Sequence, residues 1–167
     1  MNPDGTNQVR LTNNIALDTE PEWTPDSSKI VFNSARDGKQ GIYMMSPNGS
    51  GLVRLTGNLW HDIQPAFSPD GRSIVFVSLR EGVRQLYMMS SDGISPQRLT
   101  GGGQESPSWG VAGNPPPSLR IVFQSNRDGN DEIYSINSDG SGVLRLTFNT
   151  AFDREPSLSP DRAKIAF

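Results

Sequence analysis

The hydrophobic residues of this chain form short runs separated by polar turns, and no stretch has the pattern of a helix of useful length. One run, Lys29–Phe32, is continuously apolar after its first residue and has counterparts at 73–76, 120–123 and 164–167. Such a run is typical of a strand buried on both faces. Another, Val53–Thr56, alternates apolar and polar residues with period two, as strands do. The pattern therefore predicts an all-β fold.

The pattern also repeats along the chain, with a period of about 44 residues. The triplet Arg-Leu-Thr occurs at 10–12, 54–56, 98–100 and 145–147, with spacings of 44, 44 and 47 residues. Prolines and tyrosines keep the same phase, at Pro21, Pro65, Pro107 and Pro156 and at Tyr43, Tyr87 and Tyr134. Several independent landmarks in one register indicate tandem copies of a single structural unit.

Each repeat is predicted to contain four short strands. In the first complete repeat they lie at Glu22–Thr24, Lys29–Phe32, Gly41–Met45 and Val53–Thr56. The turn Pro25–Ser28 joins the first two, because Pro presets the turn backbone and Asx residues tolerate the positive φ that a turn can need. Four antiparallel strands in a unit of this length indicate the blades of a β-propeller.

At these residues the sequence resembles the TolB-like propeller family. The repeat of that family has a Pro-x-Trp-Ser-Pro-Asp-Gly stretch, an Ile-x-Phe strand, an Arg-Asp-Gly turn, an Ile-Tyr strand and a final Leu-Thr. Residues 65–71 and 133–147 match it closely, and the resemblance covers essentially the whole chain. It implies a periplasmic or otherwise extracytoplasmic protein that binds other envelope proteins through its propeller. A fold hosts many functions, so function must be argued from the site.

The repeat divides one propeller domain or arc, residues 1–167, into units. The expected units are 1–12, the end of a preceding blade; the blades 13–56, 57–100 and 101–147; and 148–167, the first two strands of a further blade. The leading strand is expected near Gln8–Thr12. Because such ends expose unpaired strand edges, we expect an open arc completed by the rest of a longer protein or by a second copy, as a homodimer. A closed four-bladed monomer is a third alternative.

The third repeat departs from the pattern. Pro107 and Val122 are fifteen residues apart, where the other repeats have ten, and segment 110–117 with its three consecutive prolines replaces the usual Pro-Asp turn. The simpler interpretation is an insertion tolerated at a loop tip. The alternative is a rigid polyproline spur that touches a partner.

Composition and motifs argue against several function classes. A net charge of −3 with scattered Lys and Arg residues provides no basic surface for nucleic acid. With no cysteine and a single histidine, His61, thiol chemistry is excluded and any His-based mechanism depends on one residue. No Gly-x-Ser-x-Gly, Walker or His-Glu-x-x-His motif occurs. We therefore predict no catalysis, cofactor or bound metal. The chain start has neither a signal peptide nor an apolar anchor, so no membrane insertion is expected.

The family resemblance places the connection into the first strand and the connection between the second and third strands on one face. Charged and polar residues recur there in phase, at Asp18, Asp62, Gln104 and Asp153 and at Arg36, Arg80 and Arg127. A ring of acids would favour a cation or a basic segment of a partner, and the Arg side chains would grip carboxylates. Alternatively, each Asp bonds to nearby backbone and each Arg pairs with the next acidic residue, Asp37, Glu81 or Asp128. Their recurrence favours this structural interpretation.

Residues that break the repeat are better candidates for function. Trp60 and His61 stand where the first repeat has Ala16 and Leu17, and Phe152 takes the position of His61 in the fourth repeat. An aromatic residue on that rim could anchor a protein partner, because Trp is enriched at interface hot spots. It could equally pack against the next blade.

Three functions compete at this point. The first is a non-catalytic protein-interaction scaffold of TolB type, a fragment of a larger cell-envelope protein. The second is the substrate-gating propeller of a larger serine peptidase. The third is a lectin-like propeller with sugar pockets between blades. Sugar sites stack a pyranose on an exposed aromatic in every blade, whereas Trp23, Phe67 and Trp109 are interpreted as core residues, which weakens the lectin hypothesis.

Overall fold

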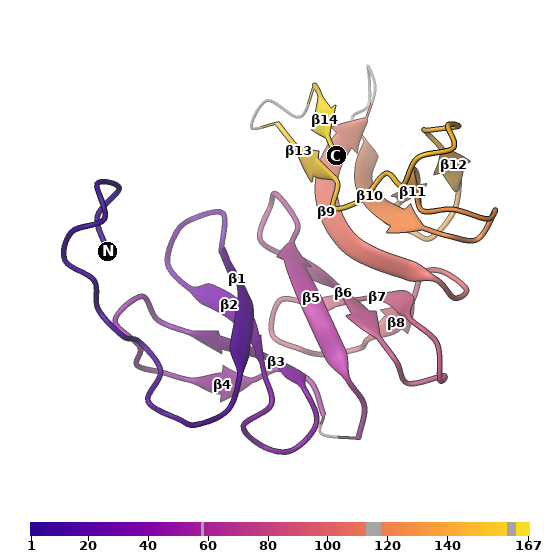
Figure 1. The fold of residues 1–167 in the computed structure, drawn as a ribbon. Helices are drawn as coiled ribbons and strands as arrows, with labels where there is room; N and C mark the ends of the chain where they lie inside the picture. Colours follow the sequence, from indigo (N-terminus) through magenta and orange to yellow (C-terminus); the bar gives the residue numbers. More distant parts are fainter. Residues whose placement is uncertain (58, 113–117, 160–162) are drawn as a thin grey trace.

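Four antiparallel sheets follow one another along an arc (Figure 1). The structure is a computed structural model that describes residues 1–57, 59–112, 118–159 and 163–167. The first blade contains β1 (Asp18–Trp23), β2 (Ile30–Ser34), β3 (Gly41–Met45) and β4 (Val53–Arg54). The second contains β5 (Asp62–Phe67), β6 (Ser73–Ser78), β7 (Gln85–Ser90) and β8 (Gln97–Arg98). The third contains β9 (Gln104–Ala112), β10 (Ser118–Ser125), β11 (Glu132–Asn137) and β12 (Leu144–Arg145), and β13 (Ser157–Leu158) pairs with β14 (Ile165–Ala166).

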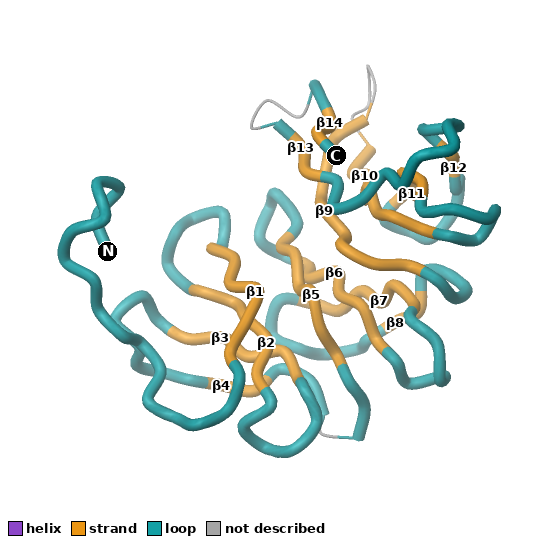
Figure 2. The backbone as a smooth tube through the Cα atoms, viewed as in Figure 1, coloured by secondary structure: helices purple, strands orange, loops and turns teal. Residues whose placement is uncertain are grey.

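The strands of each blade pair in sequence order, so each blade is a four-stranded meander. This confirms the all-β prediction of three complete blades and a further two-stranded unit. Loops make up much of the remaining chain, as Figure 2 shows. None of the described residues forms a helix long and apolar enough to cross a membrane.

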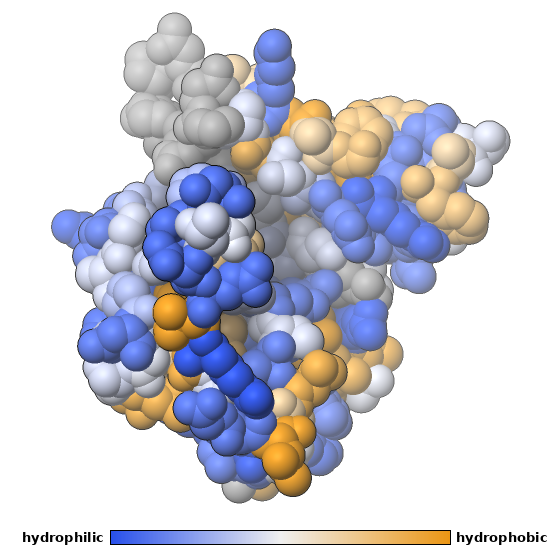
Figure 3. Space-filling model, turned by 60° about the vertical axis from the view of Figure 1, so that its left-hand side comes forward, coloured by the Kyte–Doolittle hydropathy of each residue, from blue (hydrophilic) through white to orange (hydrophobic). Residues whose placement is uncertain are grey.

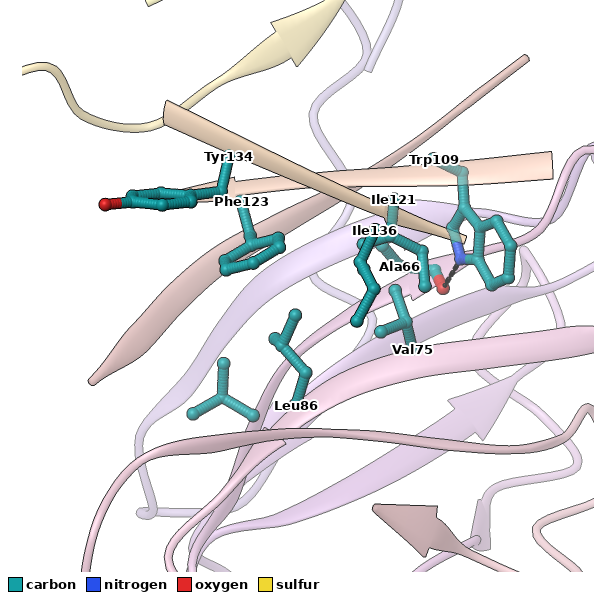
Figure 4. Packing of buried hydrophobic residues seen from close by; sticks show 9 residues of the cluster. Ala66, Val75, Leu86, Trp109, Ile121, Phe123, Tyr134 and Ile136 are labelled. Atoms are coloured by element: carbon teal, nitrogen blue, oxygen red, sulfur yellow. Dashed lines mark hydrogen bonds between the residues drawn. The ribbon is translucent and has the colours of Figure 1, made fainter. Parts of the chain in front are cut away.

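The second strand of each complete blade lies at the centre of the packing. Every residue of β2 is buried, and so are all residues of β6 after Ser73. One core cluster joins Val31 and Ile42 of the first blade to Phe67 and Phe76 of the second. A second cluster joins the second blade to the third (Figure 4). The continuously apolar runs therefore correspond to strands buried between neighbouring blades.

The first strands are longer than the sequence predicts. Strand β1 begins at Asp18, not near Glu22, and a bulge between Thr19 and Glu22 interrupts its pairing with β2. Glu20, inside this bulge, has a φ of 53°. A bulge lets two residues of one strand oppose one of its partner, so the strand bends there. The in-phase residues Gln64, Ser106 and Glu155 also have positive φ.

The insertion of the third repeat lengthens a hairpin. Strands β9 and β10 continue pairing past the usual turn, with Gly110 opposite Arg120 and Ala112 opposite Ser118. Part of the predicted loop is therefore strand. The polyproline hypothesis concerns residues 113–117, which lie outside the described residues.

The predicted leading strand near Gln8–Thr12 is not a strand in the structure. In the complete blades, Arg54 and Arg98 lie on strands that pair with a third strand, and the described residues provide no third strand for Arg10. The segment nevertheless lies beside the first blade as its counterpart lies beside the second. A Cβ at Gly49 would be 2.7 Å from the Leu11 carbonyl oxygen, and one at Gly93 would be 2.5 Å from that of Leu55.

Candidate functional site: the rim and the central channel

The connections that enter each first strand and those that join the second and third strands lie together at one edge of the arc, here called the rim. The amide of Ala35 donates a hydrogen bond to the Leu17 carbonyl, at 3.3 Å, and that of Leu79 donates to the His61 carbonyl, at 3.0 Å. Two kinds of connection, about 18 residues apart in sequence, thus form one surface. This is the arrangement that the family resemblance implies.

The rim acids of the first two blades pair with the rim arginines across each blade. The Arg36 guanidinium lies 3.0 Å from Asp18, and that of Arg80 lies 3.3 Å from Asp62, whose side chain is 1% exposed. Burial alone would raise the pKa of Asp18, but hydrogen bonds from Ser34 and Asn14 outweigh it and lower that pKa to about 2. These carboxylates therefore hold the ends of their own blades together, and the arginines bind them instead of the adjacent acids.

Asp153 and Arg127 vary this arrangement. Asp153 is buried and accepts a hydrogen bond from the Asn149 side chain at 2.7 Å, as Asp18 does from Asn14 at 2.8 Å. Arg127 donates to the Ser125 hydroxyl at 3.2 Å. The side chain of Gln104 lies outside the described part of the structure. The sequence analysis missed the supporting asparagines, although the Asn-x-x-x-Asp spacing at 14 and 149 was visible in the repeat.

A second recurring network lies at the outer side of each blade. The Tyr43 hydroxyl donates to Asp37 at 2.7 Å, and Arg54 donates to the Tyr43 oxygen at 3.0 Å. Burial and the bond to Asp37 raise the pKa of Tyr43 to about 12. Tyr87 bonds to Glu81 at 2.9 Å in the same way. Asp37 and Glu81, the acids next to the rim arginines, therefore bind these tyrosines and the arginine of the Arg-Leu-Thr triplet.

Several hydrophobic side chains of the rim connections are exposed. Trp60 is 42% exposed, Leu59 68% and Phe152 66%. His61 is half-buried, and its carbonyl belongs to the backbone pairing described above. Much of the Trp60 side chain therefore faces solvent, as an anchor for a partner requires. These residues form the apolar rim: Leu17, Leu59, Trp60, Phe148 and Phe152.

The bulges of the first strands in the three complete blades and the in-phase residue Glu155, together called the bulge residues, line the centre of the arc. A pocket of about 410 Å³ lies between them and includes Glu20, Gln64, Ser106 and Glu155. Each bulge amide after the first is bound by a side chain of the preceding blade: that of Gln64 by Glu20 at 3.0 Å, that of Ser106 by Gln64 at 3.0 Å, and that of Glu155 by Gln124 at 2.9 Å. The residues of the channel are therefore these bulge residues, which the sequence analysis did not single out although each directly precedes a repeat proline.

Glu22 is the unusual residue of the channel wall. Its counterparts in the repeat are Ala66 and Ser108, which are small. One of its carboxylate oxygens accepts a hydrogen bond from the Phe67 amide at 3.1 Å. Burial nevertheless raises the pKa of Glu22 to about 7, because the charged form loses hydration and the single bond compensates only in part.

Other cavities provide less specific chemistry. A cavity of about 540 Å³ lies between the first two blades, where Lys29, Met44 and Asp70 contribute to its wall. Its Phe67 is buried, and Trp109 is buried in the next interface, so neither presents an exposed ring on which a sugar could stack. Trp23, by contrast, is 53% exposed, so its predicted core position is wrong in this structure. Within the described ranges, no group of three or more His, Cys, Asp or Glu residues could hold a metal ion.

Comparisons with known proteins agree with this geometry. The crystal structure of TolB from Acinetobacter baumannii superposes with a TM-score of 0.84 at 28% identity, covering 98% of this chain and 40% of TolB. A putative TolB from Agrobacterium tumefaciens superposes with a TM-score of 0.81 at 29% identity, covering 91% of this chain and 55% of that protein. The chain thus spans about half the length, or less, of these proteins.

More distant structures share the fold alone. A puromycin-hydrolyzing peptidase from Mycobacterium tuberculosis superposes with a TM-score of 0.58 at 12% identity, covering 84% of this chain and 23% of the peptidase. No curated protein sequence matches the chain. Residues 60–167, however, match the family described as the TolB beta propeller domain, PD40. With its repeat, its bladed sheets and these matches, the chain belongs to the TolB beta propeller family.

Proposed function

We propose that the chain is a non-catalytic scaffold that binds another protein through the apolar rim, in a periplasmic or otherwise extracytoplasmic compartment. The observation that carries the proposal is the exposure of Leu59, Trp60 and Phe152 at positions that the repeat does not specify. Leu59 and Trp60 are consecutive in one connection, and Trp is enriched at the hot spots of protein interfaces. The family supports the compartment, since the fold matches TolB structures.

The charges of the rim support an apolar anchor over an ionic one. Asp18 and Asp62 already bind Arg36 and Arg80, so a charged partner would have to displace a formed ion pair. Such displacement gains little, because the partner then exchanges one pairing for another. Trp60, by contrast, offers a rigid aromatic surface that loses little conformational freedom on binding.

The test is a binding assay with the intact protein and envelope extract, followed by affinity measurement on any protein it retains. Trp60→Ala is expected to weaken binding by roughly tenfold or more, as truncation of an aromatic hot spot does. Asp153→Asn is the control, because Asp153 is buried beneath the rim surface. If Trp60→Ala leaves the affinity unchanged while circular dichroism shows an intact fold, the apolar rim is not the binding surface.

A further inference from the structure

Asn48 is the one asparagine of the sequence that is directly followed by glycine. It lies in the turn that joins β3 to β4, at the end of β3 away from the rim, and its side chain is exposed. Figure 3, which brings the side of the first blade forward, shows that hydrophilic residues form much of this surface. Water therefore reaches the Asn48 side-chain amide.

The same turn occurs at three other positions of the repeat, and each of those has aspartate where this one has asparagine. The glycine that follows has a φ between 83° and 87° in all four turns, and its amide donates to the carbonyl three residues earlier at 2.9 Å. One side-chain oxygen in each turn accepts the amide two residues ahead, at 2.9 to 3.2 Å. The four turns thus share one geometry, around Asp4, Asn48, Asp92 and Asp139.

An ionised aspartate is stabilised in this turn. In the third blade, Ser141 donates its hydroxyl to Asp139 at 2.6 Å and its amide at 2.9 Å. The hydroxyl bond is the main cause that lowers the pKa of Asp139, so the side chain is held as a carboxylate. Asn48 receives the same two bonds from Ser50, at 2.7 Å and 3.0 Å. An aspartate in place of Asn48 would therefore keep both bonds, and its charge would strengthen them.

The surroundings of Asn48 also favour the reaction that makes this exchange. The amide nitrogen of Gly49, once it leaves the Ser46 carbonyl, can attack the side-chain carbon of Asn48, because glycine has no side chain to obstruct the approach. Negative charge then develops on Oδ1 of Asn48, and the two Ser50 donors already bind that atom. The leaving atom, Nδ2, makes no hydrogen bond among the described residues.

We propose that Asn48 is a deamidation site, at which the folded turn converts asparagine into the aspartate that the repeat has at the other three turns. The Gly49 nitrogen bonds to Cγ of Asn48 and gives its proton to Nδ2, the bond between Cγ and Nδ2 breaks, and ammonia leaves. Water then hydrolyses the cyclic imide, to aspartate or, through the other carbonyl, to isoaspartate. The product has one more negative charge than a chain of net charge −3. The inference concerns a turn outside the apolar rim and does not depend on the proposed function.

The primary test is incubation of the intact protein at mildly alkaline pH, where the Gly49 amide loses its proton more readily. Ion-exchange chromatography should resolve a form with one more negative charge, and peptide mass spectrometry should locate the change at Asn48. Asn137 is the internal control, because Arg120 binds its oxygen at 3.1 Å, its nitrogen donates to Ser141 at 3.1 Å, and serine follows it. An Asn48 that stays intact, or that reacts no faster than Asn137, would refute the proposal.

Variants of Ser50 test whether the turn itself promotes the reaction. Ser50→Ala removes the hydroxyl donor and is expected to slow the loss of ammonia from the folded protein by roughly tenfold or more, whereas Ser50→Thr keeps a hydroxyl and should retain the rate. In concentrated urea the three proteins should react at the same rate, because the donors are no longer held in place. A folded Ser50→Ala protein that reacts as fast as the wild type, or faster, would contradict this role of the turn.

Asn48→Asp tests whether the repeat accommodates the product. This variant should unfold at a urea concentration no lower than the wild type, because its carboxylate keeps both bonds from Ser50. Asn48→Ala is the matched control: it provides no acceptor and should unfold at a lower urea concentration. If Asn48→Asp unfolds as early as Asn48→Ala, the turn does not accommodate aspartate and the proposed conversion is wrong.

Discussion

Trp23 and Trp109 occupy the same position of the repeat, yet one is 53% exposed and the other 7%. Trp109 lies between two blades, where its ring packs with Ala66, Val75 and Ile121 and its indole nitrogen has an acceptor. Trp23 also lies on the first strand of its blade, but among the described residues no strand pair of a preceding blade packs against it. The difference shows that the repeat encodes half of each interface and that the preceding blade supplies the other half.

The first blade nevertheless forms all four strands with the pairing of the second. Phe32 and Tyr43 have ring centroids 6.0 Å apart, as do Phe76 and Tyr87. The register of β2 with β3 likewise matches that of β6 with β7. Strand pairing within a blade thus does not require a preceding blade. The burial of the first strand does require one, as expected for an array stabilised by nearest-neighbour contacts.

The largest expected difference between the two interfaces is in the tryptophans themselves. Trp109→Ala should lower the free energy of unfolding by about 3 to 5 kcal/mol, because it leaves a cavity and removes the bond to Ala66. Trp23→Ala should lower it by less than about 1 kcal/mol, because an exposed ring has little burial to lose. Urea unfolding of dilute protein, followed by circular dichroism, measures both. Equal losses would mean that the first blade is covered in solution even when the protein is dilute.

Glu22 offers a comparison between pH values. Because its folded pKa is raised from 4.5 to about 7, the folded state binds the proton more tightly than the unfolded chain. Stability should therefore fall as pH rises from 4.5 to 7, by an amount on the order of 2 kcal/mol after allowance for its partial exposure. Glu22→Gln should flatten the unfolding free energy over this window and stabilise the fold at pH 8. An unchanged slope would show that another group causes the pH dependence.

The bulge contacts should have a smaller effect. Gln64→Ala leaves the Ser106 amide without its acceptor, which should lower the free energy of unfolding by about 1 to 2 kcal/mol. Gln64→Glu keeps an acceptor of the same length and is expected to lose less than half of that amount. Urea unfolding of both variants provides the measurement. An equally large loss in Gln64→Glu would indicate that the side-chain amide group of Gln64, and not its acceptor oxygen alone, stabilises the fold.

The smallest expected change is at the apolar rim. Trp60→Ala should alter the free energy of unfolding by no more than about 0.5 kcal/mol, because Trp60 is 42% exposed and lies in a connection. A large loss of stability in the same unfolding assay would instead place Trp60 in the packing between blades. It would also remove the main support for its role as a partner anchor.

The fold could be predicted from the sequence because strand pairing within a blade is local. The continuously apolar runs, the repeat prolines and the Arg-Leu-Thr triplets of the three complete blades mark strands that pair with their sequence neighbours. What the residue types did not reveal was which side chains reach another blade or the far end of their own. Arg36 binds Asp18 across 18 residues instead of Asp37 beside it, a choice set by the geometry of the connection and not by proximity in sequence.

The exposure of Trp23 escaped sequence analysis for a related reason. Trp23 stands at the same position of the repeat as Trp109, and its exposure differs because no strand pair lies in front of it in the structure. The bulge residues were overlooked because no one residue type is common to all of them: Glu20, Gln64, Ser106 and Glu155. They share a backbone conformation, with φ between 49° and 53°, which residue identity does not disclose outside glycine.

The bulge contacts limit how these repeats can be recombined. A repeat carrying Glu or Gln before its proline can be followed by any repeat, since its own bulge side chain reaches the next amide. A repeat carrying Ser there is competent only with a long amide at the position of Gln124. When blades are duplicated or exchanged to build longer arrays, the residue before the proline and the residue at the position of Gln124 must therefore be transferred together. A junction that separates them would leave a bulge amide without its side-chain acceptor at every copy.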